Sequence, residues 1–218
     1  MKQDVGLTTA LRAPVQDRSK ASYERMLAAA EALFIAQGSD NFTLQDVSRR
    51  GKVSIGSIYS RFGGREALLH AVHLRVLERV DTQMAQRLDA ARQQATNLNQ
   101  LVVALIDAVA ETLRDHGNIM RPMMQRASVD PVVAANGKAS YAATATAVKE
   151  ALLLHADEIR QPDPIVAVDS AYRVLYAAIA RYLGFGTSAD AARDGEWDTL
   201  KRDLGRMIAA FLGSDIVL

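Results

Sequence analysis

Only a few side chains of this 218-residue sequence are of the kinds that act as catalysts or metal ligands. The sequence holds four histidines and no cysteine, which excludes a disulfide framework, a zinc ribbon and a cysteine nucleophile. Glu66, His70 and His73 have the i, i+4, i+7 spacing that places three side chains on one helix face, where they could hold a metal ion. Three such residues are more often a solvated face, and no HExxH motif or Gly-rich phosphate loop accompanies them. An all-α enzyme is therefore kept only as an alternative, and no metal, catalytic residue or cofactor is expected.

A second group of side chains could bind phosphate. The net charge is only +1, but residues 1–70 hold ten Lys and Arg against seven Asp and Glu, and the basic residues cluster between Arg49 and Arg65. A local basic patch is the electrostatic footprint of a phosphate-binding surface. The hydroxyl groups of Thr43 and Tyr59 lie in the same stretch and can donate to phosphate oxygens. For the charges alone, an ordinary solvated surface is an equally good interpretation.

Short helices must position these side chains. Thr43 and Asp46 have the spacing of a capping box, and Ser54 is a good N-cap after the turn at Gly51. Two short helices joined by a three- or four-residue turn, after a longer one, form the helix-turn-helix pattern, and one helix fits the major groove, which is ~12 Å wide. The predicted helices run from Ser19 to Gly38, from Thr43 to about Arg50 and from Ser54 to Phe62.

The remaining sequence also predicts helices. The chain is 49% hydrophobic but only 6% aromatic, and no strand-like alternation is present, which favours an all-α fold of about nine helices. No apolar run is long enough for a membrane span and no signal peptide is evident, so we expect a soluble, cytoplasmic protein. The further helices are predicted at Arg65 to Gln94, Leu98 to Asp115, around Met120 to Met124, Pro131 to Leu154, Ile165 to Leu183 and Glu196 to Leu212.

Between Phe42 and Leu69 the sequence resembles the TetR (tetracycline-repressor-like) family of transcription regulators. The resemblance rests on three segments, which are Phe42 to Val47, Val53 to Tyr59, and Phe62 with Arg65 to Leu69. The departures are small: the glycine of the turn is displaced to Gly51, so that Lys52 stands where glycine often takes a positive φ, Ser57 replaces the usual threonine, and Ser48 replaces the usual small residue. Beyond Leu69 the resemblance is one of length and helix number.

The resemblance implies a division of the chain and a function. Residues 1–17 would be a flexible arm, residues 18–64 the helix-turn-helix DNA-binding domain, and residues 65–218 an effector-binding and dimerisation domain. Tyr59 and Arg65 would hold the DNA backbone. The alternatives are that Tyr59 is an aromatic residue of the core and that Arg65 is a solvated surface residue. A cation at a helix start opposes the helix dipole, so Arg65 also favours an external anion. The expected DNA-binding residues are Thr43, Lys52, Ser54, Ile55, Gly56, Ser57, Tyr59, Ser60, Arg61 and Arg65.

One DNA-binding head buries too little surface for tight binding, so a homodimer on a palindromic operator is expected. The apolar stripes of the last two long helices are the predicted dimer surface, with packing inside one chain as the alternative. They comprise Val168, Tyr172, Leu175, Ile179, Tyr182, Leu200, Leu204, Met207 and Phe211.

By the same resemblance, the middle helices would enclose a small-molecule pocket. An apolar or aromatic effector would change DNA affinity by altering the spacing of the two heads, and repression is the commoner outcome in the family. Control by a protein partner instead of a small molecule is an alternative. The expected pocket residues are Met120, Met123, Met124, Tyr141, Tyr176 and Phe185.

Overall fold

A computed structural model describes residues 15–185 and 195–215, and within these ranges the chain is all-α, as predicted. The first helix begins at Val15, four residues before the predicted start at Ser19, and residues 1–14 of the predicted arm lie outside the described residues. Apart from the 3-10 helix η1 (Ala156–Glu158), the elements are α1 (Val15–Gln37), α2 (Leu44–Gly51), α3 (Ile55–Phe62), α4 (Arg65–Gln94), α5 (Leu98–Asp115), α6 (Gly117–Ala127), α7 (Pro131–Leu153), α8 (Pro164–Tyr182) and α9 (Trp197–Gly213).

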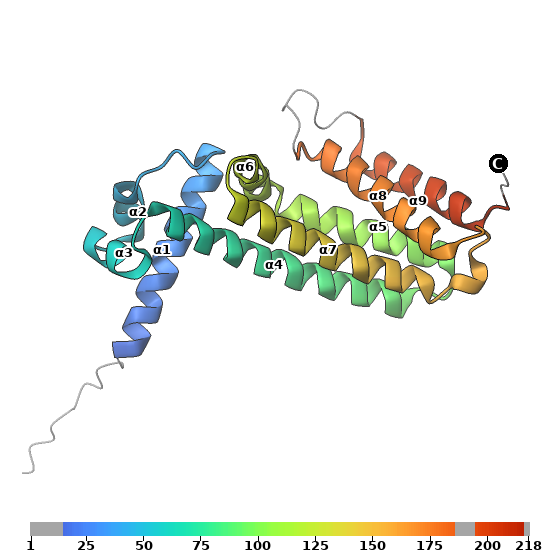
Figure 1. Cartoon of the computed structure of the whole chain (residues 1–218), viewed down its shortest axis with the longest axis horizontal. Coiled ribbons are helices and arrows are strands. Elements are labelled where there is room, and N and C mark those ends of the chain that lie inside the picture. Colours follow the sequence, from blue (N-terminus) through green and yellow to red (C-terminus); the bar gives the residue numbers. More distant parts are fainter. Residues whose placement is uncertain (1–14, 186–194, 216–218) are drawn as a thin grey trace, which may run out of the picture.

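The helices form two parts that share α4 (Figure 1). Helices α1 to α3 lie together at one end, and we call them the module. The long helix α4 leaves the module and runs beside α5 and α7, and α8 and α9 pack on these helices. We call this second part, which comprises most of α4 with α5 and α7 to α9, the body. Helix α6 stands between the two parts and contacts α1 as well as α5 and α7. In the described ranges no helix combines the length and apolar character needed to cross a membrane.

Local capping explains where the two shortest helices begin. The Thr43 hydroxyl accepts from the Asp46 amide at 3.2 Å, and the Asp46 carboxylate accepts from the Thr43 amide at 2.9 Å, which completes the predicted capping box. The Ser54 hydroxyl accepts from the Ser57 amide at 3.1 Å and caps α3. These bonds satisfy amides that have no partner within their own helix.

The turn between α2 and α3 explains the displaced glycine. A Cβ on Gly51 would lie 3.1 Å from the Arg25 carbonyl oxygen and 3.2 Å from Ala29 Cβ, so α1 and α2 can approach this closely only because residue 51 is glycine. Lys52 then takes the left-handed conformation with φ 50°, which was expected from its position. For a lysine this conformation is strained, since its Cβ crowds the backbone there.

Two hydrophobic cores hold the parts together. The module's core contains Ile58 of α3 and the edge-to-face pair Phe34 and Phe42, with ring centroids 5.2 Å apart. It continues into α4 as far as Val80 and takes residues from α6, so the three module helices do not bury their apolar faces alone. The body's core begins further along α4 and includes α5, α7, α8 and α9.

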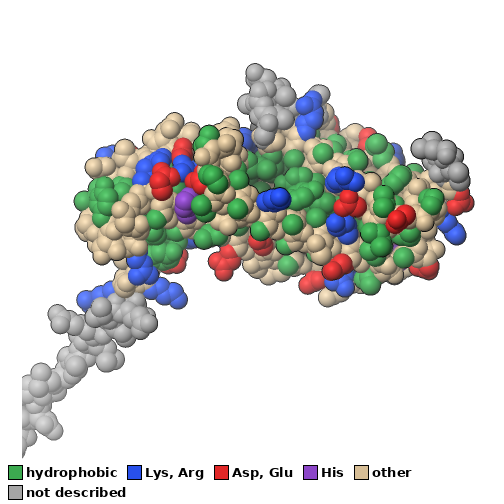
Figure 2. All heavy atoms as spheres, in the orientation of Figure 1, with side chains coloured by type: hydrophobic (Ala, Val, Ile, Leu, Met, Phe, Trp, Pro, Cys, Tyr) green, Lys and Arg blue, Asp and Glu red, His purple; other side chains and the backbone are tan. Residues whose placement is uncertain are grey.

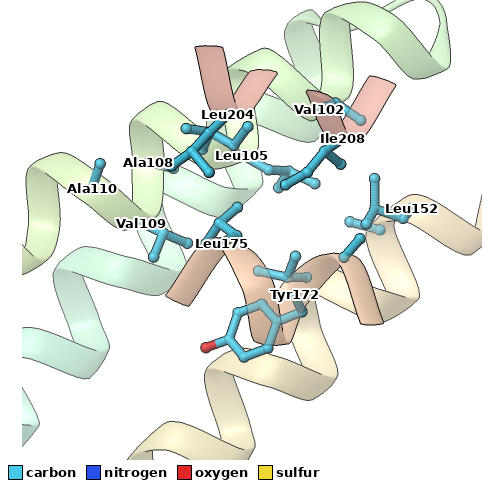
Figure 3. Packing of buried hydrophobic residues seen from close by; sticks show 14 of the residues in the cluster. Val102, Leu105, Ala108, Val109, Ala110, Leu152, Tyr172, Leu175, Leu204 and Ile208 are labelled. Carbon is cyan, nitrogen blue, oxygen red and sulfur yellow. The ribbon is translucent and has the colours of Figure 1, made fainter. Parts of the chain in front are cut away.

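Most of the stripe predicted for dimerisation on α8 is packed inside the chain. Figure 3 shows Leu204 and Ile208 of α9 close to the labelled residues of α5, and Tyr172 and Leu175 of α8 belong to the same buried cluster. The prediction was wrong for these positions because α8 and α9 must first bury an apolar face against α7 and α5. The predicted residues that are buried in this way are Val168, Tyr172, Leu175, Ile179 and Leu204.

The other predicted dimer residues have different surroundings. Tyr182 is half-buried, where its hydroxyl donates to the Gly195 carbonyl at 3.1 Å and its ring lies 5.0 Å from that of Trp197. Leu200 is half-buried against the body's core. Met207 and Phe211 are exposed on α9. The exposed large apolar side chains of these two helices are Ile165, Val166, Val174, Met207 and Phe211, which we call the outer apolar face.

Candidate nucleic-acid interface and ligand cavity

The outward side of α3 carries small and polar side chains. Its inward side buries Ile58 completely, and Ile55 is half-buried against the same core. No atom lies within 4 Å of the point where a Cβ on Gly56 would stand, so a partner can approach the backbone closely there. The exposed predicted contacts on α3 are Gly56, Ser57, Tyr59, Ser60 and Arg61.

Tyr59 and Arg61 extend from this surface in different ways. The Tyr59 ring is 53% exposed, which excludes the core aromatic considered as its alternative. The Arg61 guanidinium lies 4.8 Å from the centre of the Tyr23 ring, and that ring stacks on Phe62. A cation held over an aromatic face keeps its charge and its N–H donors. The surface therefore presents one free phenol and one positioned cation.

Three further predicted contacts border the surface. Lys52 is exposed in the turn before α3. The hydroxyl of Ser54 lies 2.7 Å from that of Ser57. The Thr43 hydroxyl donates to Asp46 at 2.7 Å, and this bond, with a second from the Thr43 amide, holds the pKa of Asp46 below its usual value. Thr43 can reach an external acceptor only by giving up that bond, whereas Lys52 is free to move.

Arg65 has internal partners that the sequence interpretation did not include. Its Nε donates to the Phe42 carbonyl at 3.1 Å, and its terminal nitrogens contact the Asp40 carbonyl and the carboxylates of Asp40 and Glu66. The inference that a cation here calls for an external anion was wrong, because Asp40 and Glu66 are the anions. In this structure Arg65 ties the start of α4 to the loop between α1 and α2.

Arg126 of α6 joins the module to the body through three carboxylates, and we call this group the Arg126 junction. It contacts Asp40 in the loop before α2, Glu66 on α4 and Asp130 at the start of α7. Asp130 also accepts from His70 at 2.8 Å. Burial acts to raise the pKa of Asp130, but the hydrogen bonds from His70 and Arg126 outweigh burial and hold it well below its usual range. Figure 2 shows acidic and basic side chains gathered with a histidine near the α6 end.

The junction also bears on the metal-site alternative. Ligand atoms of Glu66, His70 and Asp130 lie within 4.8 Å of one another, but the Arg126 guanidinium contacts two of these groups and supplies the positive charge. His73, the third residue of the predicted set, is not part of this cluster and lines the cavity described next. The arrangement is an ion-pair network between helices.

A cavity of 370 Å³ lies between α4, α6, α7 and α8, with Leu113 of α5 on its wall. Three methionines of α6 line it, and the rings of Tyr141 and Tyr176 meet edge-to-face with centroids 4.7 Å apart. Figure 2 shows hydrophobic side chains gathered where the surface is hollowed between α6 and the body. The volume is within the usual range for small-molecule sites. The predicted residues that line the cavity are Met120, Met123, Met124, Tyr141 and Tyr176.

Phe185 was also predicted to line the pocket, but it does not line the cavity. It follows the left-handed turn at Gly184, which ends α8, and its side chain is buried in the body's core. The prediction was wrong because an aromatic after a helix stop can pack on either side of that helix, and the sequence does not show which.

Comparisons with known proteins agree with this architecture. Residues 26–72 match the model of bacterial regulatory proteins of the tetR family. A protein assigned to this family from Mesorhizobium loti is 18% identical with a TM-score of 0.70, covering 89% of this chain and 96% of its own. GusR of Salmonella enterica is 22% identical (TM-score 0.57; 93% and 98%), and the fatty acid degradation regulator FadR of Bacillus halodurans is 12% identical (TM-score 0.61; 91% and 96%). No curated protein matches the chain.

Residues 26–72 are thus a tetR-family region, and the fold of the chain is that of solved tetR-family regulators. The matched region is that of DNA-binding bacterial regulators. The matched residues run from within α1 through α2 and α3 to the first part of α4. The region that the sequence shares with the family therefore carries the exposed surface of α3.

The chain beyond the matched region contains cavity residues that the sequence analysis missed. Four of them are apolar positions of α4, whose spacing is that of any buried helix face, and others lie on α7. The four are Val76, Leu77, Val80 and Met84. One signal was available, because His73 interrupts this apolar stripe. A polar residue at a core position needs a partner, and the structure places it on the cavity wall.

Proposed function

We propose that this protein is a homodimeric, cytoplasmic repressor that binds a palindromic operator through α3 and releases it when a small, mainly apolar effector enters the cavity. The observation that carries the proposal is the position of α6. Met123 of this helix belongs to the module's core and also lines the cavity, so one element contacts both. In this scheme residues 18–64 are the DNA-binding domain and residues 65–218 bind the effector and form the dimer.

The surface of α3 supports a division of labour on DNA. Gly56, Ser57 and Ser60 are small enough to bring the helix to base edges in the major groove, with Ile55 and Arg61 at its borders. Tyr59 and Lys52 then reach phosphates, and Ser54 and Thr43 do so at the helix starts. Arg65 is held by internal partners, so it acts through the loop between α1 and α2. Phosphate contacts position the protein, whereas base contacts set its sequence preference.

The outer apolar face supports a dimer through α8 and α9. Val174 is 53% exposed and Met207 is 63% exposed, although both lie on helices whose opposite sides are buried. Large apolar side chains exposed on two adjacent helices are typical of an interface with another chain. A twofold pairing of these helices would present two α3 surfaces to two half-sites.

The effector acts only if it binds one arrangement of the two heads better than the other. Helix α6 offers a route, because a ligand against Met120, Met123 and Met124 presses on the helix that carries Arg126. The Arg126 junction then passes the displacement to Asp40 and Glu66. The relatives share at most 22% identity in the comparisons given above, so the effector is argued from the cavity and not from their names.

The test is selection of bound sequences from random duplex DNA by the purified protein. An enriched palindrome is the expected result. The variant that tests the surface is Gly56→Glu, which adds a negative charge to α3. Since no atom of another element lies within 4 Å of the new Cβ, the variant should fold but should not enrich the palindrome. Enrichment of the same palindrome by this variant, or no enrichment by the wild type, would refute the proposed surface.

A further inference from the structure

Two buried side-chain atoms in the described part of the chain have no hydrogen-bond partner, namely His73 Nδ1 and the Tyr172 hydroxyl oxygen. The first belongs to a residue of the cavity wall, whereas Tyr172 does not line the cavity. His73 lines it and is only 4% exposed. Tyr172 packs behind Tyr141 and Tyr176, with ring centroids 5.6 and 6.1 Å away, and these two rings line it. An unpaired buried polar atom costs roughly 1–3 kcal/mol, and of these two residues only His73 could gain a partner from a molecule in the cavity.

The charges of the wall restrict what that partner can be. Burial, with the neighbouring charge of His70 as the second cause, lowers the pKa of His73, so its ring is neutral near pH 7. Among the described lining residues there is no carboxylate, and the cation Lys138 is exposed. A positively charged ligand would therefore meet no counter-charge. A carboxylate beside His73 would be buried next to a neutral ring, which is costly.

We propose that the effector is a compact, uncharged, mainly apolar molecule whose hydroxyl group hydrogen-bonds to the ring of His73. The inference rests on the proposed function of the cavity as the effector site. A hydroxyl group both donates and accepts, so it pairs with either tautomer of a neutral imidazole. The volume of 370 Å³ accommodates a molecule of one or two rings. The methionines of α6 supply an apolar wall that adapts to shape.

The test uses four probes of one shape with different polar groups: naphthalene, 1-naphthol, 1-naphthoate and 1-naphthylmethylammonium. Their binding to the full-length protein is measured by equilibrium dialysis in the absence of DNA. The expected result is that 1-naphthol binds roughly three- to tenfold more tightly than naphthalene, which corresponds to one neutral hydrogen bond. The two charged probes should bind more weakly than 1-naphthol.

Variants then assign the preference to one side chain. His73→Leu should bind naphthalene as the wild type does but lose the preference for 1-naphthol, and His73→Gln should keep part of it. The matched control is His155→Leu, since His155 pairs with Glu158 at 2.8 Å and does not line the cavity. This control should leave the ratio unchanged.

Several outcomes overturn the inference. They are equal binding of 1-naphthol and naphthalene by the wild type, tightest binding of 1-naphthoate, no binding of any probe, or an unchanged preference in His73→Leu. Because the dialysis contains no DNA, these results are separate from the selection of DNA sequences. Palindrome enrichment with a failed probe series would refute only the hydroxyl anchor, whereas the expected probe series without enrichment would refute the proposed DNA surface.

Discussion

The module and the body differ in what holds them together, although α4 runs through both. Helices α2 and α3 have eight residues each and are too short to be stable by themselves. They depend on capping bonds and on core residues contributed by α4 and α6. The body's helices α4 and α5 have 30 and 18 residues and bury long apolar faces against each other. The module thus presents a surface set by local geometry, while the body can enclose a cavity.

This difference indicates where the cavity of the body can influence the module. A cavity lined by methionines allows several packings, whereas a closely packed small core does not. Helix α6 contacts both kinds of environment, because Met123 is in the module's core and on the cavity wall. The polar link beside it is the Arg126 junction, so breaking that link is the strongest test of whether the two parts act as one.

Arg126→Met should have the largest effect, a loss of about 3 kcal/mol in the free energy of unfolding. The Arg126 side chain is 13% exposed and that of Asp130 is 9% exposed. Removing the cation leaves a buried carboxylate whose remaining partners are His70 and the backbone amides of Val132 and Val133. Urea unfolding followed by circular dichroism and by Trp197 fluorescence measures the loss. Trp197 reports the body, so separated transitions in the variant would show that the module unfolds first.

The matched control for this prediction is Arg92→Met. Arg92 pairs with Asp89 at the surface, at 3.7 Å, and exposed pairs contribute at most about 1 kcal/mol. Equal losses in the two variants would show that the Arg126 junction does not hold the parts together.

Met207→Asp should weaken the proposed dimer at least about 100-fold, because a charge would be buried without a partner in an apolar interface. The change tests whether the body's outer apolar face is covered by a second chain. Sedimentation velocity over a range of concentrations measures it. Leu154→Asp is the control, since Leu154 is 65% exposed but lies outside α8 and α9. Dissociation by both variants, or by neither, would contradict the assignment of the interface.

The same difference explains what could be predicted from the sequence. Caps and turns depend on residues three or four positions apart, so the helices of the module, the capping box at Thr43 and the strain at Lys52 were predictable. The Arg126 junction was not, since Arg126 and Asp40 are separated by 86 positions. On α8, apolar periodicity indicated a buried face but not whether the covering helix belongs to the same chain, and Tyr172 was therefore assigned to the dimer.

Two glycines of the module offer a smaller and more selective test. Gly51→Ala should lower the free energy of unfolding by about 2 kcal/mol, because its Cβ would meet the Arg25 carbonyl at 3.1 Å. Gly56→Ala should raise it by about 0.5–1 kcal/mol, since alanine favours the helix and nothing lies nearby. Thermal unfolding measures both changes. A destabilised Gly56→Ala variant would mean that the α3 surface is packed against something.

The smallest predicted effect is on pH dependence and concerns the histidine that faces the cavity. Burial and the charge of His70 lower the pKa of His73 from 6.5, although Asp130 opposes the change. The unfolded chain therefore binds a proton below pH 6.5 that the folded chain does not, so the free energy of unfolding falls as pH falls through this range. His116 contributes in the same direction, because burial also lowers its pKa. His73→Leu should flatten part of the decline between pH 7.5 and pH 5.5, measured by urea unfolding, and His116→Gln should flatten a separate part. If the free energy of unfolding of His73→Leu declined as steeply as that of the wild type, the His73 ring would be accessible to solvent in the folded protein. The contrast between buried groups of the body and the exposed surface of the module would then not hold at that residue.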